Sequence, residues 1–150
     1  MGAGAALGAR WLSSSRRVFV LVSDAECNEG ALWEAAMFAA HHRLGNLVAI
    51  VDLNGQQALG YTEEVLSLSP LVDRWKAFGW TAHVVDGHDI EEMTETVASL
   101  DTDSEPPHVL VAETVFGKGV SYMEGQIKWH YWPMSDSEFR QAMSELGEEE

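Results

Sequence analysis

Continuous apolar runs alternate with amphipathic stretches along this chain. Val18–Val22 and Leu47–Val51 are apolar, largely β-branched and followed directly by polar residues, which is typical of buried parallel strands. Between these runs, Glu29–Leu44 has small and apolar residues at helical spacing, and Gly45 follows it as a stop signal. The order of strand, helix and strand predicts a βαβ unit.

The same alternation continues to the end of the chain. Further helices are predicted at Leu71–Phe78, Ile90–Leu100 and Ser135–Leu146, and further strands at Thr81–Val85 and Val109–Val115. Ser135 and Glu138 have the spacing of a helix capping box. The pattern predicts an α/β fold with a doubly wound, mainly parallel sheet of about five strands and helices on both faces. We expect Val20 and Ile50 in its core.

The composition indicates one acidic globular domain over residues 1–150, since this length suits one domain and is too short for two. A net charge of −15 with only 9 Lys and Arg residues argues against nucleic-acid binding, which depends on clustered cations. No stretch approaches the roughly 18 uncharged apolar residues of a membrane span. A single cysteine, Cys27, cannot form an internal disulfide, so a cytoplasmic location is expected.

Polar residues follow the first two predicted strands. Asp24 comes after the first strand and Asn54 after the second, so neighbouring parallel strands would bring both side chains to one crevice at the edge of the sheet, with Asp24 a surface carboxylate. Oxygen ligands of this kind suit Mg²⁺, which often completes its shell with phosphate oxygens. A helix beginning near Asn28 would direct free N–H groups at the same place. Either residue alone is more often a turn or cap residue.

The segments around these residues resemble a known family. The first block runs from Ser23 to Gly30 and is followed by Leu32–Ala36 and, about thirty residues after the motif begins, by Asp52-Leu53-Asn54; together they are similar to the thiamine-diphosphate motif of transketolases. The resemblance continues through Asn54–Gln56, Thr62–Val65, Trp75–Trp80, Val85–Asp89 and Thr114–Ser121. It covers nearly the whole chain and is greatest for the amino-terminal subunit of split bacterial transketolases.

The resemblance implies thiamine diphosphate and Mg²⁺ as cofactors. Asp24 and Asn54 would be side-chain metal ligands, and the carbonyl of Gln56 would be a third ligand. The residues implied in cofactor binding are Ser23, Asp24, Ala25, Glu26, Asn54, Gln56 and Lys128. The chain departs from the family at both motif glycines, where Ser23 and Ala25 stand.

Two residues take catalytic roles by the same resemblance. Glu29 matches an acidic residue at the family's subunit interface near the coenzyme ring; otherwise it is a first-turn glutamate that favours the helix dipole. His130, with Lys128, lies in an aromatic stretch that approaches the substrate channel in the family, although packing is the default role of clustered aromatic residues. His88 is expected to be a turn or cap residue, and Cys27 an incidental thiol.

The resemblance also implies a missing partner. In the family, the glutamate that contacts the coenzyme's pyrimidine ring comes from a separate pyrimidine-binding domain, and no segment here matches it. Gly2–Arg10 resembles the end of a helix, so the family's preceding segment is expected to be absent. We therefore expect a dimer or heterotetramer with a carboxyl-terminal transketolase subunit, the interface including Glu29, Trp33 and the loop around Trp129.

The expected activity is transfer of a two-carbon ketol unit between sugar phosphates or onto a related acceptor. Two alternatives stay open at the level of the sequence. One is a ketoacid-decarboxylating subunit, such as a deoxyxylulose-phosphate synthase or a ketoacid dehydrogenase component. The other is a non-catalytic remnant that only binds a partner chain.

Overall fold

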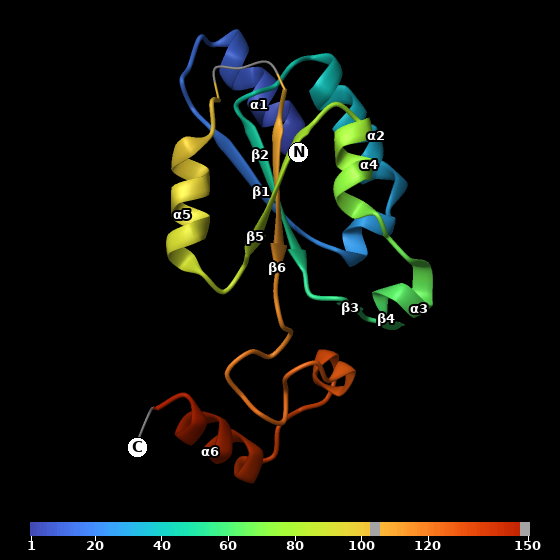
Figure 1. The fold of residues 1–150 in the computed structure, drawn as a ribbon, viewed down its shortest axis with the longest axis vertical. Coiled ribbons are helices and arrows are strands. Elements are labelled where there is room, and N and C mark those ends of the chain that lie inside the picture. The colour runs from blue at the N-terminus through green and yellow to red at the C-terminus, as the bar shows by residue number, and fades with distance from the viewer. Residues whose placement is uncertain (103–105, 148–150) are drawn as a thin grey trace.

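The computed structural model describes residues 1–102 and 106–147 and contains a four-stranded parallel sheet (Figure 1). Its strand order is β1-β2-β6-β5. The strands are β1 (Val18–Ser23), β2 (Leu47–Leu53), β6 (His108–Glu113) and β5 (Thr81–Asp86). Every neighbouring pair is parallel. A small antiparallel pair, β3 (Gln56–Gln57) and β4 (Gly60–Tyr61), follows β2.

Helices connect the strands and cover the sheet. The α-helices are α1 (Gly2–Trp11), α2 (Gly30–His41), α3 (Thr62–Leu66), α4 (Leu71–Ala77), α5 (Ile90–Ser99) and α6 (Asp136–Glu145). Two 3₁₀ turns, η1 (Ala25–Asn28) and η2 (Ile127–His130), complete the described elements. Among the residues described, no helix is long and apolar enough to cross a membrane.

The predicted fold class is confirmed, with differences in the number of strands and in some boundaries. The parallel sheet has four strands instead of about five, and the β3–β4 pair was not predicted. β6 ends at Glu113, before the predicted end at Val115. The capping box of Ser135 and Glu138 at the start of α6 is present as predicted.

The two faces of the sheet carry separate cores. One face packs against α1, α2 and α4, where Trp75 and Trp80 are buried with Val109 and Val111. The other packs against α5 through residues such as Leu110. Val20 and Ile50 are half-buried and pack against these cores, one on each face, so their expected core position is confirmed only in part.

Helix α1 approaches the sheet closely because of one glycine. A Cβ at Gly2 would lie 2.3 Å from Cγ2 of Val20 on β1. The small residues Ala6 and Ala9 of α1 are buried. A helix of small residues can therefore lie directly on the edge strand.

The chain beyond β6 leaves the sheet. Figure 1 shows this segment, coloured orange to red, continuing past the end of β6 and finishing in α6. Its η2 turn packs against β3. Loop residues near the end of the chain therefore come back beside the segment that follows Asn54.

Candidate active site

The carboxyl ends of β1 and β2 lie side by side. In the register of this pair Ser23 lies opposite Asp52, and the Asp24 N–H donates to the Asp52 carbonyl at 3.1 Å. The sheet therefore brings Asp24 to the segment that ends in Asn54, as the strand pattern predicted.

Asp24 is fully buried, with none of its surface exposed. Its Oδ2 accepts hydrogen bonds from the N–H of Gly55 at 2.8 Å and from the hydroxyl of Thr62 at 3.1 Å. The expectation of a surface carboxylate is therefore wrong. The Gly55–Thr62 segment folds over the side chain, and the contact with Thr62 spans 38 positions, which no local pattern in the sequence reveals.

The other carboxylate oxygen, Asp24 Oδ1, is buried and has no hydrogen-bond partner among the described residues. Burial is the largest influence on this carboxyl and raises its pKa above 3.8, although hydrogen bonds from Gly55, Thr62 and Ala25 act in the opposite direction. A buried acceptor without a donor is costly unless a cation or proton satisfies it. Asp24 thus has one oxygen fixed by the protein and one available to a ligand.

Asn54 is held in a turn beside Asp24. Its Oδ1 accepts from the N–H of Gln56 at 2.9 Å, and its Nδ2 donates to Oδ2 of Asp52 at 3.1 Å. Asp52 also accepts a short hydrogen bond from the hydroxyl of Thr114, just after β6. No role was predicted for Asp52, although its position two residues before Asn54 lets the two side chains meet at the end of β2.

Gln56 is buried, and its side-chain Oε1 has no hydrogen-bond partner in the described part of the chain. It begins β3, directly after the turn at Gly55. Gly55 has φ 73°, the left-handed region that favours glycine. Asp24, Asn54 and Gln56 therefore belong to one compact group around this turn.

Ser23 and Glu26 bind each other in this structure. The Glu26 carboxylate accepts from the Ser23 N–H at 2.7 Å, and the Glu26 N–H donates to the Ser23 hydroxyl at 3.2 Å. This reciprocal pair closes the η1 turn in the manner of a capping box. The Ser23 side chain, at a position where the resemblance implies a glycine, stabilises the turn. The Ala25 N–H lies beside the carboxylate of Asp24.

The helix predicted after Asp24 begins within one residue of its expected start and ends earlier, at His41. The residues after Asp24 form the η1 turn, and α2 begins at Gly30. Glu29 is the N-cap residue of α2 and its side chain makes no capping hydrogen bond. With Glu26, it lines a mainly apolar groove between α1, β1 and α2. Glu29 is exposed, and no described contact ties it to Asp24 or Asn54.

His130 lies on the η2 turn and is exposed. Its ring stacks on Phe116 with centroids 4.7 Å apart. Phe116 lines a cleft on the α5 face of the sheet that also includes Asn54. The structure thus brings His130 to the border of the cleft that contains Asn54.

Lys128 is directed to its own loop and to α6. Its ammonium lies 3.3 Å from the Glu138 carboxylate and 4.4 Å from the ring centroid of Trp129.

His88 behaves as a turn residue, as expected: its N–H donates to the Asp86 carboxylate, and its Nε2 accepts from the Val115 N–H at 2.8 Å.

The oxygen-rich group suits a hard cation better than a soft one. Within residues 1–102 and 106–147, no cluster of three or more His, Cys, Asp and Glu side chains converges. The available donors are the free oxygen of Asp24, the amide oxygen of Asn54 and the backbone oxygen of Gln56. Carboxylate, amide and carbonyl oxygens are ligands of Mg²⁺, which keeps sites for phosphate and water. The residues present fit a magnesium diphosphate.

Comparison with known proteins identifies the family. Residues 11–150 match the family described as "Transketolase, thiamine diphosphate binding domain". The chain is 41% identical over 148 residues to one subunit of an apulose-4-phosphate transketolase from Phocaeicola vulgatus, covering 99% of this chain and 53% of that protein. It is 36% identical over 146 residues to a 6-deoxy-6-sulfo-D-fructose transketolase subunit of a Clostridium species, covering 97% of this chain and 53% of the relative.

Solved structures give the same result. Transketolase from Campylobacter jejuni has a TM-score of 0.89 and 25% identity, over 97% of this chain and 24% of that one. The chain spans about half the length of the curated subunits that it matches. This chain belongs to the transketolase family and corresponds to its thiamine diphosphate binding domain.

Proposed function

We propose that this chain is the thiamine diphosphate-binding subunit of a transketolase that transfers a two-carbon ketol unit between sugar phosphates. The observation that carries the proposal is the buried Asp24 carboxylate, with one oxygen unpaired among the described residues, beside the Asn54 turn. The name of the Phocaeicola vulgatus relative supports the substrate class and a second subunit, because it includes a sugar phosphate and designates one of several subunits.

In this proposal, Asp24, Asn54 and the Gln56 carbonyl hold Mg²⁺ and, through it, the diphosphate. When bound, the coenzyme would supply the carbanion stabilisation that transfer of a two-carbon ketol unit requires. Gly55 and Thr62 fix one oxygen of Asp24, so that the other is oriented before the metal arrives. Ser23 and Glu26 stabilise the η1 turn. From this turn, the backbone N–H of Ala25 would donate to the diphosphate.

The proposed roles of His130, Lys128 and Glu29 rest on where these residues lie in the structure. His130, exposed on the loop beside the cleft, would exchange a hydrogen bond or a proton with a sugar hydroxyl. Lys128 supplies a cation on the same loop. Glu29, exposed at the start of α2, faces the partner subunit, which contributes the pyrimidine-binding domain. A dimer or heterotetramer in the cytoplasm is the proposed assembly, and the one cysteine, Cys27, is a free buried thiol, in agreement with a reducing compartment.

A titration of the purified chain with thiamine diphosphate, with and without Mg²⁺, tests the proposal. Calorimetry should detect binding only when the metal is present, and Asp24→Ala should abolish it. Glu113→Gln, at the exposed end of β6, is the matched control and should bind like the wild type. Coenzyme binding that does not require Mg²⁺ and that is unchanged in Asp24→Ala would contradict the proposed site. A wild-type chain that binds no coenzyme even with its partner would favour the non-catalytic remnant.

A further inference from the structure

The loop that carries His130 has little burial to hold it in place. From Ser121 to Ser137, every residue is exposed or only half-buried. Apolar packing therefore contributes less to this conformation than it does in the sheet. The polar contacts of the segment decide where His130 lies.

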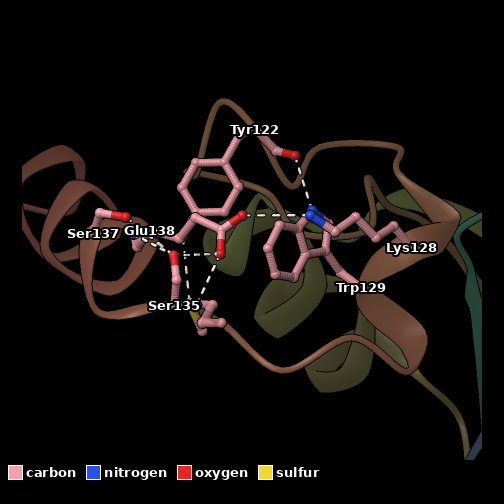
Figure 2. Close-up of polar contacts among 7 residues, drawn as sticks. Tyr122, Lys128, Trp129, Ser135, Ser137 and Glu138 are labelled. Carbon is pink, nitrogen blue, oxygen red and sulfur yellow. Dashed lines mark hydrogen bonds and ion pairs between the residues drawn. The ribbon is translucent and has the colours of Figure 1, made fainter.

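Glu138, on the first turn of α6, makes several of these contacts (Figure 2). Its carboxylate accepts from the Ser135 N–H at 2.8 Å and lies 3.3 Å from the Lys128 ammonium. Its backbone carbonyl accepts from the Tyr122 hydroxyl at 2.6 Å. One residue thus connects the start of α6, the η2 turn and the segment around Tyr122.

Trp129 completes the network next to His130. Its indole N–H donates to the Tyr122 carbonyl at 2.9 Å, and its ring lies under the Lys128 ammonium. Tyr122 and Lys128, which both contact Glu138, therefore also contact Trp129. The ion pair and the Tyr122 hydrogen bond converge on the residue that precedes His130 in the chain.

The opposite side of the loop is attached to the β3–β4 region. The Tyr131 hydroxyl donates to the Ala58 carbonyl, and the Tyr61 hydroxyl donates to the Gly125 carbonyl at 3.3 Å. His130 stacks on Phe116. The loop is therefore held between α6 on one side and the segment that follows Asn54 on the other.

The charge state of Glu138 agrees with this role. The hydrogen bond from the Ser135 N–H, then that from the Ser135 hydroxyl, and then the contacts with Lys128 lower the pKa of Glu138 below 4.5. The carboxylate stays ionised near neutral pH, and the ion pair with Lys128 persists there. Asp136, on the same helical turn, makes no described side-chain contact with the loop.

We infer that Glu138 is a positioning residue that, through Lys128 and Tyr122, holds the η2 turn and keeps His130 beside Phe116 at the border of the cleft. Glu138 itself does not touch the reacting groups. The consequence for turnover rests on the proposed function of His130. The contacts by which Glu138 fixes the loop do not depend on the proposed function of His130.

Limited proteolysis of the isolated chain tests the hold on the loop. Trypsin cleaves after Lys128, and the rate of cleavage reports how often the segment opens. Glu138→Gln keeps the capping box, because glutamine serves at this position, but removes the charge that binds Lys128. Mass spectrometry should show cleavage at Lys128 several-fold faster than in the wild type. Asp136→Asn removes the same charge from the same turn and should cleave at the wild-type rate.

Kinetics of the complex with the partner subunit tests the consequence for His130. Glu138→Gln should lower kcat several-fold and leave coenzyme affinity and the melting temperature unchanged. Lys128→Met combined with Glu138→Gln should lower kcat no further than Lys128→Met alone, because the Glu138 carboxylate acts on the loop through its ion pair with Lys128. Unchanged cleavage at Lys128 would overturn the hold, and faster cleavage with unchanged kcat would overturn the positioning of His130. A wild-type complex without ketol transfer would refute the proposed function, while the cleavage rates would still decide the role of Glu138.

Discussion

The Asp24 carboxylate is buried at the end of β1 with one oxygen unpaired among the described residues. Burial raises its pKa above 3.8, so the folded chain binds this proton more tightly than the unfolded chain does. Stability contributed by such a group is present below 3.8 and is lost as the pH rises through the folded pKa. At neutral pH the metal-free chain therefore bears a cost for keeping Asp24 ionised.

Asp24→Asn removes this charge and keeps the shape of the side chain. We expect the free energy of unfolding of the metal-free chain at about pH 7 to rise by about 0.5–2 kcal/mol, as when strain at a functional site is relieved. Urea unfolding measures the change, which should disappear below pH 3.8. Asp24→Ala is the contrast: it leaves the Gly55 N–H and the Thr62 hydroxyl without their acceptor and should lose about 1–3 kcal/mol. If Asp24→Asn were less stable than the wild type at about pH 7, the predicted rise in the free energy of unfolding would be wrong.

Cys27 is also buried, and its thiol is expected to be unreactive. Burial raises the pKa of Cys27 to about 12, and the nearby charges of Asp24 and Glu26 act in the same direction. Because the thiolate is the reactive form, iodoacetamide at about pH 8 should label the native chain very slowly and the urea-unfolded chain completely. Mass spectrometry of the alkylated product measures both. Rapid labelling of the native chain would show that the η1 turn opens readily.

At the scale of elements, the sequence predicted the regular parts of the fold and missed the irregular ones. The runs at Val18–Val22 and Leu47–Val51 became β1 and β2 because uninterrupted apolar residues suit a sheet covered on both faces. The β3–β4 pair has two-residue strands, too short for a periodic signal. Its geometry depends on contacts between distant residues, such as Thr62 with Asp24.

The candidate site was predictable to a similar extent. The positions of Asp24 and Asn54 at adjacent strand ends followed from parallel pairing alone. The burial of Asp24, the attachment of Lys128 to Glu138 and the stacking of His130 on Phe116 could not be predicted, because each depends on where a loop folds back. Ser23 and Glu26 have the three-residue spacing of a capping box, so their reciprocal hydrogen bonds were predictable from the sequence.

Strands β5 and β6 bring two histidines together. The rings of His83 and His108 have centroids 5.8 Å apart, and Nε2 of His83 and Nδ1 of His108 are buried without hydrogen-bond partners in the described part of the chain. Burial, and secondarily the adjacent His108, lowers the pKa of His83 below 6.5. The unfolded chain therefore binds this proton more tightly, and stability should fall as the pH drops below 6.5.

His83→Gln should reduce this pH dependence. One proton changes the free energy of unfolding by at most about 1.4 kcal/mol per pH unit. Urea unfolding of the wild type and the variant, at several values between about pH 7.5 and 5.5, measures the difference in slope. His41→Gln, exposed on α2, is the control and should keep the wild-type slope. If His83→Gln left the pH dependence of the free energy of unfolding unchanged, the His83–His108 pair would not be its cause.

Two glycines with the same backbone angle should respond differently to substitution. Gly55 and Gly117 both have φ 73°, but a Cβ at Gly117 would lie 2.8 Å from the backbone of Met123, whereas Gly55 has open space. A left-handed conformation costs an ordinary residue about 1–2 kcal/mol. We expect Gly55→Ala to lose that amount of stability and Gly117→Ala to lose more, as measured by urea unfolding. Equal losses would show that the Met123 turn can shift to make room.

At the scale of the whole molecule, the loop around Trp129, which was expected at the interface, exposes large aromatic side chains. Trp33 is half-buried, its indole N–H donates to the Cys27 carbonyl at 2.8 Å and its ring stacks on Phe78. Trp129 is half-buried. The aromatic residues exposed on the loop are Tyr131 and Trp132, at 65% and 64%. Clustered exposed aromatics of this kind often mark an interaction surface.

The edge strand β1 exposes apolar surface as well. Leu21 is 71% exposed and Phe19 is 47% exposed, both on the face of the sheet whose core cluster includes residues of β2, β5, β6 and α5 but none of β1. With a net charge of −15, two copies of this chain repel each other.

The last prediction follows from these surfaces and from the proposed function. The isolated chain should show no ketol transfer from a sugar phosphate, even with thiamine diphosphate and Mg²⁺, because in the proposed function the partner subunit contributes the pyrimidine-binding domain. Adding the carboxyl-terminal transketolase subunit should produce turnover in proportion to the complex formed. The measurement is a coupled assay of product release over a titration of the partner. Asp24→Ala in the same mixture should leave the complex intact and abolish turnover. Substantial turnover by the chain alone would refute a site completed by a partner, because it would require every catalytic group to come from these 150 residues.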